Sequence, residues 1–270
     1  MVSMGGMKDL LTLTIYFAKS DMRNRVAGSF GGFVWLVLQP LLLTLLFIFL
    51  FSCIIKIKIQ STFSGTSSFP LFLISGLLPW LAFQEALFRA MNSILENREV
   101  VKKIYLPLAS LPIGYILSVQ FVYGVVFFIF SIICLLGGGS FLGFIRFLML
   151  AWLLLLAYSL QTILSIGLGF IFSAIAVYVR DVIQIVPLFL QVWFYLTPIV
   201  YPENMVPEKY KFFLEINPFN SFVRIYKLIL LKKIFPPYTM WFFPSIFSLF
   251  MFIAGFHIFN KLKDGFADVL

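Results

Sequence analysis

Six long apolar stretches restrict what this chain of 270 residues can fold into. A helix needs roughly 20 mostly apolar residues to cross the hydrocarbon core of a bilayer, and each stretch comes close to that length or exceeds it. The runs are continuous rather than alternating, which favours helices over the strands of a membrane β-barrel. The sequence therefore predicts an all-α, polytopic membrane protein with six transmembrane helices. These lie near Gly32–Ile55, Pro70–Asn92, Leu111–Leu136, Phe144–Val177, Ile183–Tyr201 and Met240–Asn260.

The composition favours the same class, since 61% of the residues are hydrophobic and only 11% are charged. A soluble domain of this length would leave too much apolar surface in water. The net charge of +9 fits basic residues that flank membrane spans and meet anionic headgroups. No basic cluster is interleaved with aromatic residues in a soluble domain, so nucleic acid is not expected as a partner.

Basic residues in the short flanks predict that both termini face the cytoplasm. They precede the first stretch, follow the second and fourth, and follow the sixth. A further basic group falls in the connection 202–237, which this topology places outside. A long connection weighs less in setting orientation than a short loop, so the expected orientation stands.

Two segments are apolar but too short to cross a bilayer. Residues 7–27 mix apolar and charged side chains and predict an interfacial helix on the inner leaflet. Residues 202–237 hold two short apolar pieces separated by Asn217–Asn220, a strong helix breaker. They predict a re-entrant or interfacial helical hairpin between spans five and six, of which the re-entrant form is preferred.

The fourth stretch is longer than a bilayer requires. It is expected to tilt, break or extend past the membrane, and Gly167 and Gly169 are its expected weak points.

Few residues carry obvious chemistry. Glu85 and Arg89 are spaced i,i+4 at the end of the second stretch, so they share one helix face and can pair. Such an intramembrane pair is a candidate for function, or a self-neutralised pair that holds the bundle together. His257, Cys53 and Cys134 are expected to be packing residues. No metal site is predicted, because one histidine and no ligand-spaced cluster are present.

Seven pieces of the chain occur in a recognisable order, and together they carry a resemblance to a known family. They follow an amphipathic start that runs through Arg23-Asn24-Arg25 into a glycine-rich bend. The seven pieces are Phe33–Ser52, Ser75–Trp80, Asn97–Pro107, Ala176–Val182, Leu196–Pro202, Asn217–Asn220 and Phe266–Leu270. In this order the chain resembles the permease subunits of type-2 ABC transporters that export polysaccharides, namely O-antigen, capsular polysaccharide or teichoic acid.

The resemblance implies a single transmembrane permease domain, 1–270, in the bacterial inner membrane. Two copies would form the pathway for a lipid-linked polysaccharide, most readily O-antigen, and two cytoplasmic ABC ATPase subunits would supply the energy. No cofactor is expected in this chain, and ATP and Mg would bind the partner. The sequence has no G-x-x-x-x-G-K-[ST] motif, which agrees with hydrolysis in another chain and with no enzymatic activity of its own.

The resemblance also implies roles for particular segments. Residues 97–107 would be the coupling helix held by the ATPase, residues 7–27 a gate near the entry of the substrate, and residues 202–237 the outer gate. The coupling residues are expected to be Asn97, Arg98, Glu99, Val100, Lys102, Lys103, Ile104 and Tyr105, with a second contact through Arg180 and Asp181.

Two further sets of residues are candidates for substrate contact. Arg23 and Arg25 lie at the expected headgroup level, where a planar guanidinium suits a lipid pyrophosphate, although ordinary headgroup contact explains either residue as well. Aromatic rings can stack on a sliding sugar chain, although most aromatic residues of a membrane protein face lipid or neighbouring helices. The expected channel aromatics are Phe47, Phe51, Trp193, Phe194 and Tyr195.

Three other functions stay open. A type-2 ABC permease for a small lipid or drug would share the coupling helix. An ion-coupled secondary transporter would need acidic residues in several spans, yet only Glu85 is clearly placed in one. A membrane enzyme such as a glycosyltransferase would need paired carboxylates or a metal site at the surface, and the 11 acidic residues are scattered.

Overall fold

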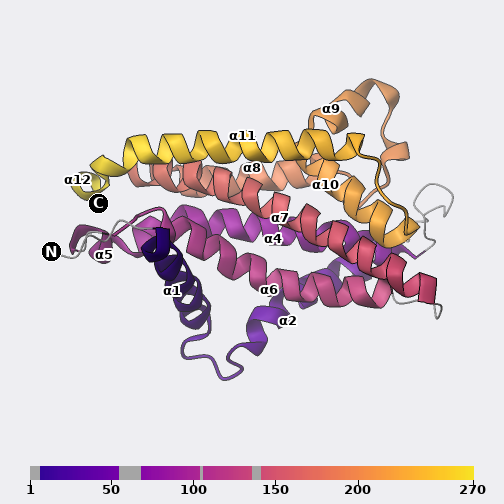
Figure 1. Cartoon of the computed structure of the whole chain (residues 1–270), viewed down its shortest axis with the longest axis horizontal. Helices are drawn as coiled ribbons and strands as arrows, with labels where there is room; N and C mark the ends of the chain where they lie inside the picture. The colour runs from indigo at the N-terminus through magenta and orange to yellow at the C-terminus, as the bar shows by residue number, and fades with distance from the viewer. Residues whose placement is uncertain (1–6, 55–67, 104–105, 136–140) are drawn as a thin grey trace.

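A computed structural model describes residues 7–54, 68–103, 106–135 and 141–270. Every regular element in these ranges is helical, so the prediction of an all-α protein is confirmed for them. Long helices run side by side, with the two termini at one end and the short helices α9 and α10 at the other (Figure 1). The main helices are α1 (Met7–Val26), α2 (Val34–Ile48), α4 (Phe69–Glu96), α5 (Arg98–Lys103), α6 (Ser110–Leu135), α7 (Phe141–Tyr178), α8 (Val182–Leu196), α9 (Lys211–Ile216), α10 (Pro218–Lys227), α11 (Thr239–Leu262) and α12 (Phe266–Val269).

Short pieces of other helix types extend or connect these elements. In the described ranges, the π-helical segments Phe49–Ile54 and Leu228–Lys232 continue α2 and α10, and 3-10 turns lie at Glu203–Met205, Glu208–Tyr210 and Lys263–Gly265.

Among the described residues, five helical segments are long and apolar enough to cross a membrane. They are Val34–Ile54, Phe69–Glu96, Ser110–Cys134, Leu148–Tyr178 and Thr239–Gly265, and each matches one of the expected spans. The remaining expected span, Ile183–Tyr201, corresponds to α8, an apolar helix of 15 residues. At 1.5 Å per residue this helix covers about 22 Å, which is less than the hydrocarbon thickness.

α4 lies at the centre of the bundle. In its most apolar window 67% of the residues are buried, against 17% for α2 with its π-helical extension and 22% for α11. Trp80 and Phe83 of α4 are fully buried and meet aromatic rings from α8 and α10. The faces of α2 and α11 are therefore left for lipid or for another chain, whereas α4 organises the interior.

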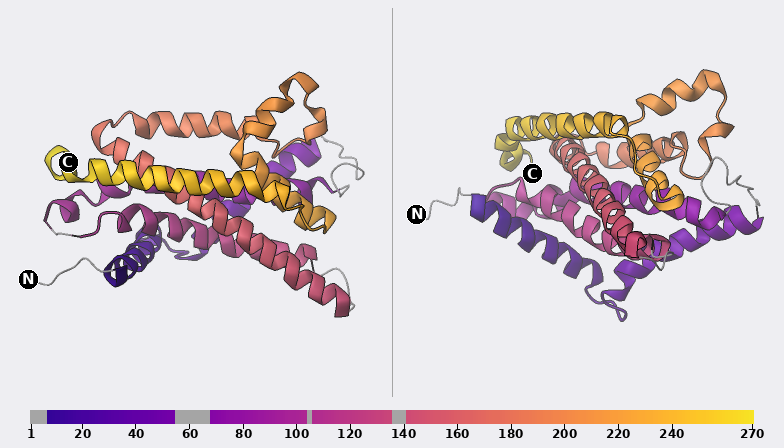
Figure 2. Two further views of the ribbon diagram at one scale, coloured as in Figure 1. Left: turned by 45° about the horizontal axis from the view of Figure 1, so that its top comes forward. Right: turned by 45° about the vertical axis from the view of Figure 1, so that its right-hand side comes forward.

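α7 does not break at its glycines, so Gly167 and Gly169 are not the weak points expected, and a tilt or an extension past the membrane is left for the fourth span. It is a continuous helix of 38 residues, about 57 Å long, and it crosses the other long helices obliquely (Figure 2). Gly167 and Gly169 are sites of close packing instead. A Cβ at Gly169 would crowd Ile116 and Ala90, and one at Gly167 would overlap the backbone of Met251 in α11.

Gly167 and Gly255 bring the backbones of α7 and α11 into contact. A Cβ at Gly255 would overlap the carbonyl group of Gly167, so neither position has room for a side chain. Small residues of this kind let membrane helices approach closely, and dispersion between the helices then stabilises the pair.

A test of this contact is Gly255→Val. The branched side chain would force α7 and α11 apart, and we expect the protein in detergent to lose about 2 kcal/mol of stability, seen as unfolding at a lower temperature. His257, which the sequence predicts to be a packing residue, is instead exposed on the same helix, so His257→Val should unfold close to the wild-type temperature. Equal thermal stability of the two variants would refute the close contact.

Candidate functional site

The end of the bundle that carries both termini holds a buried cluster of charged side chains. α1 packs against α6, and its approach is so close at Gly114 of α6 that a Cβ there would collide with Phe17 and the carbonyl group of Thr14. This places Asp21 of α1 inside the protein, with 0% of its surface exposed. Because an isolated buried carboxylate is very costly, the carboxylate requires partners.

Asp21 has a partner for each of its oxygens. The Arg89 guanidinium of α4 donates from Nη2 to one oxygen and forms an ion pair, and the Ser118 hydroxyl group of α6 donates to the other. The same guanidinium donates from Nη1 to Glu96 at 3.1 Å and lies over the ring of Tyr115, 5.1 Å from its centroid. Arg89 thus joins the end of α1 to the last turn of α4.

The structure corrects the expected pairing of Glu85 with Arg89. Glu85 instead accepts a hydrogen bond from Nη2 of Arg25 at 3.2 Å, while Arg89 is taken by Asp21 and Glu96. The i,i+4 spacing does place both residues on one face of α4, but Glu85 meets Arg25 and Arg89 meets Asp21, both from α1. The two charges are therefore neutralised by other partners rather than by each other.

Arg23 and Arg25, the expected ligands of a lipid pyrophosphate, lie in different environments. Arg23 is exposed, and Arg25 is largely buried with one edge bound to Glu85. The Nη1 atom of Arg25 is buried and has no hydrogen-bond partner in the part of the chain that the structure describes. Arg25 therefore has a positioning role in the structure, and Arg23 is the residue that an anion at the surface could reach.

The charged cluster continues into the segment expected to contact the ATPase. After Glu96, Asn97 closes the end of α4 by donating to the carbonyl group of Ser93 at 2.7 Å and to the hydroxyl group of Tyr115 at 2.8 Å. α5 follows at once, with Arg98, Glu99 and Lys102 exposed and Val100 half-buried. Two of the expected coupling residues, Ile104 and Tyr105, lie outside the described residues, as does the side chain of Lys103.

An apolar cluster beneath α5 was not expected from the sequence. Val101 of α5 packs in it with residues from α1, α4, α6, α7 and α11, and Phe266 of α12 is fully buried there. The other buried members are Phe17, Ile94, Leu111, Phe170, Ala174, Val177 and Phe259. In the sequence, the one indication of this cluster was the motif Phe266–Leu270, which supported the family resemblance alone. In the structure, this motif packs against α5.

The second expected contact with the ATPase lies at the same end. Arg180 and Asp181 are exposed in the turn between α7 and α8. The Tyr178 hydroxyl group donates to the carbonyl group of Leu262 at 2.7 Å and fixes the end of α7 to α11.

The expected channel aromatics gather near the other end, but most of them are packed. Phe194 of α8 is 7% exposed and contacts Trp80, Phe47 and Tyr195, and the stack of Phe47 on Phe51 lies beside it. Trp193 packs edge-on against Trp80 and donates from its indole nitrogen to Asn217 at 2.8 Å. Tyr195 is the member of this set with an exposed ring. This group therefore joins α2, α4 and α8 and holds the segment that begins α10.

The fold and the site define a multi-pass membrane protein with an exposed short helix beside a buried charge cluster. The family model described as ABC-2 type transporter matches residues 12–231 of the chain. The chain therefore belongs to the ABC-2 type transporter family. Membership places the chain in a membrane and implies an ABC ATPase in a partner chain.

Three curated relatives are similar over most of their length. The O-antigen export system permease protein RfbA of Klebsiella pneumoniae is 26% identical, with 97% of this chain and 96% of the relative covered. A protein of the same name from Myxococcus xanthus is also 26% identical, with 95% and 94% covered. The polysialic acid transport protein KpsM of Escherichia coli is 26% identical, with 76% of each chain covered.

A test of the charge cluster is Asp21→Asn. This change leaves Arg89 buried beside a neutral group, and we expect a loss of about 3 kcal/mol of stability, measured by unfolding of the purified protein in detergent. The double variant Asp21→Asn, Arg89→Gln should recover part of the loss, because both charges are then removed. Asp268→Asn, at an exposed carboxylate, serves as the control and should be neutral. A double variant whose loss is the sum of the two single losses would show that the residues do not interact.

Proposed function

We propose that this chain is the membrane-spanning subunit of an ATP-driven exporter that moves a lipid-linked polysaccharide across the bacterial inner membrane. The observation that carries the proposal is the similarity to O-antigen export permeases over nearly the whole chain. O-antigen is accordingly the leading substrate, and the relative named for polysialic acid transport matches a smaller share of the chain. A small lipid or drug remains the second candidate substrate for the same fold.

The proposed topology has six crossings, with both termini in the cytoplasm. α8 is the additional crossing, and it is completed by the residues that follow it up to Tyr201. Residues 202–237 form the re-entrant hairpin. Its support is the burial of α10 among the spans, since the Tyr226 hydroxyl group donates to Gln161 of α7 at 2.8 Å and Gln161 donates to the carbonyl group of Pro79 in α4 at 2.9 Å. A loop outside the membrane would not reach the middle of these two spans.

The proposed transporter contains two copies of the chain and two ATPase subunits. Exposed apolar residues on α2 and α8 support a pathway between copies, because these helices have little cover in the single chain. The face includes Leu42, Leu45, Leu46, Ile185, Leu188, Phe189 and Val192.

Energy would enter through the coupling helix, residues 97–107. The side chains of Arg98 and Lys102 are exposed on α5, where the ATPase would bind, while Val101 is buried against the bundle. ATP and Mg would bind in the partner, and movement of the ATPase would push α5. Glu96 and Arg89 would carry this push to α1, the proposed gate helix, as a rigid-body movement.

The first test of the function is deletion of the gene, followed by localisation of the long surface polysaccharide. Polymer that is still made but accumulates inside the cell, and that returns to the surface on complementation, is the expected result. Normal surface polymer in the absence of another exporter would reject the polysaccharide and favour a small substrate.

Charge reversal in α5 tests the coupling. Arg98→Glu with Lys102→Glu should reduce the ATPase that co-purifies with the permease about tenfold, because complementary charges at the contact become repulsive. Lys209→Glu with Lys211→Glu makes the same charge change at the opposite end of the bundle and should leave co-purification unchanged. Equal recovery of the ATPase with both double variants would exclude α5 as the contact.

A further inference from the structure

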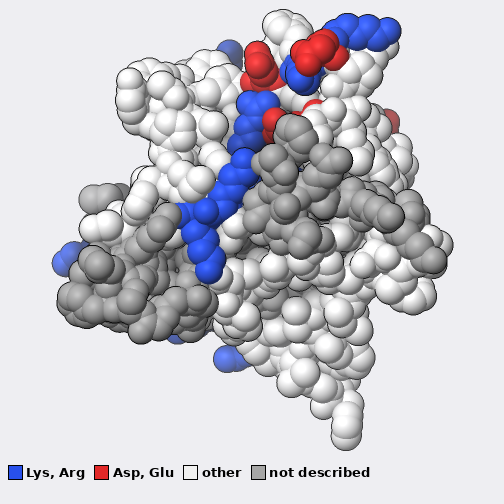
Figure 3. Space-filling model, turned by 90° about the vertical axis from the view of Figure 1, so that its right-hand side faces the viewer, with Lys and Arg blue, Asp and Glu red and all other residues white. Residues whose placement is uncertain are grey.

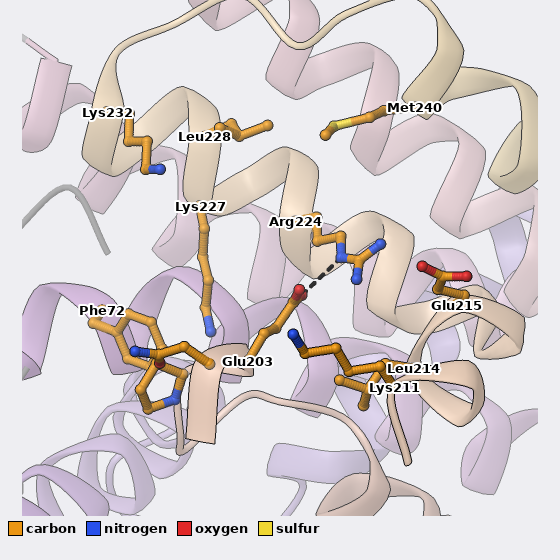
Figure 4. Close-up of a pocket in the computed structure, with 12 residues that line it drawn as sticks. Phe72, Glu203, Lys211, Leu214, Glu215, Arg224, Lys227, Leu228, Lys232 and Met240 are labelled. Atoms are coloured by element: carbon orange, nitrogen blue, oxygen red, sulfur yellow. Dashed lines mark hydrogen bonds and ion pairs between the residues drawn. The ribbon is translucent and has the colours of Figure 1, made fainter. Parts of the chain in front are cut away.

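A cavity of about 580 Å³ opens at the end of the bundle opposite the termini. It lies between the start of α4, the connection after α8, the hairpin α9–α10 and the start of α11, and Figure 4 shows its lining residues. A volume of this size is within the range of sites that bind small molecules. The cavity plays no part in the charge cluster or in the coupling segment.

Basic side chains outnumber acidic ones in this cavity. Four basic residues and two acidic residues line it: Lys211, Arg224, Lys227, Lys232, Glu203 and Glu215. A band of lysine and arginine side chains also crosses this end of the molecule and meets acidic side chains along one edge (Figure 3). The field at the cavity therefore favours an anion.

The acidic residues of the cavity leave two of its lysines without an ion pair. Arg224 donates from Nε to Glu203 at 2.7 Å, and Glu215 lies on the far side of Arg224 from Lys227 (Figure 4). Neither Lys227 nor Lys232 forms an ion pair with any carboxylate among the described residues. The excess positive charge is thus concentrated at Lys227 and Lys232.

Lys227 is held in place without being neutralised. Its amino group donates to the carbonyl group of Pro198 at 2.6 Å and lies 3.6 Å from the centroid of the Phe72 ring. An anion in the cavity would stabilise the charged form of Lys227, which neither of its present contacts achieves fully.

The rest of the lining is apolar. Phe72, Leu214, Leu228 and Met240 contribute carbon surface beside the lysines. Exposed aromatic residues of α9 and of the start of α11, Phe212, Phe213, Phe242 and Phe243, lie on neighbouring turns and suit a lipid environment. A purely hydrophilic anion would leave this wall uncovered, whereas an amphiphile would use both parts of the cavity.

We propose that this cavity binds the phosphate group of a membrane lipid, with Lys227 and Lys232 as its ligands and the apolar wall against the adjoining carbon chain. A bilayer phospholipid and a polyprenyl phosphate present the same chemistry to these residues. The proposal requires only that the chain lies in a membrane, and it does not depend on which cargo is exported.

The experiment measures binding of three probes to the purified full-length chain in a neutral detergent. The probes are phosphatidylglycerol, undecaprenyl phosphate and inorganic pyrophosphate, and native mass spectrometry counts the bound molecules. We expect at least one lipid to bind, and Lys232→Gln and Lys227→Gln to weaken it about tenfold each. Lys209→Gln removes a charge from the same end outside the cavity and should bind like the wild type.

The three probes distinguish the possible sources of the phosphate group, and the variants show whether the proposed site is the one that binds it. Binding of phosphatidylglycerol identifies a bilayer lipid, and binding of undecaprenyl phosphate alone identifies the carrier class. Pyrophosphate that binds as tightly as either lipid would overturn the role of the apolar wall, and lipid binding that is equal in wild type and Lys232→Gln would overturn the site. Lys232 is exposed, so this variant decides the matter even if Lys227→Gln fails to fold. Since the assay contains neither ATPase nor polymer, its outcome is independent of the export experiment.

Discussion

The ion pair between Asp21 and Arg89 fixes the arrangement of the end of the bundle where both termini lie. Without it, α1 would be an amphipathic helix free to lie anywhere on the membrane surface. With it, the carboxylate is buried against α4 and α6, and the position of α1 is determined relative to both helices. Arg25 and Glu85 repeat the same contact one turn further along α1. These pairs contribute more to holding α1 in one position than to the free energy of unfolding. The reason is that the cost of burying two charges offsets much of the free energy that their attraction supplies.

α4 connects the two ends of the molecule through different kinds of contact. Towards the middle of the helix, Trp80 and Phe83 pack against rings from α8 and α10, and the carbonyl group of Pro79 accepts a hydrogen bond from Gln161. Further along, Arg89 and Glu96 bind α1 and precede α5. A rigid movement of α4 would therefore displace both the hairpin α9–α10 and the exposed short helix α5.

The sequence was sufficient for the parts of the fold that depend on local composition. Continuous apolar runs predicted the five membrane-length helices, and a charged, weakly apolar start predicted α1. The partners of Glu85 and Arg89 could not be read in the same way, because Arg25 and Asp21 lie more than one helix away in sequence and only the docking of α1 brings them close. Likewise, glycines in a helix indicated a weak point, whereas Gly167 serves a contact with α11 that no local pattern contains. Of the candidate site, sequence reasoning placed the exposed residues of α5 and the turn at Arg180, but it missed the apolar cluster beneath them.

That apolar cluster has a consequence for biosynthesis. Phe17 precedes the first membrane span in the chain, whereas Phe266, whose ring packs in the same cluster, follows the last of the described spans. Domains usually fold from the N-terminus as synthesis proceeds, but here the cluster cannot close until all the spans between have been inserted. During that time α1 must keep its apolar face covered by the lipid surface. The bilayer would thus serve α1 as a temporary partner, replaced at the last stage of assembly by the protein itself.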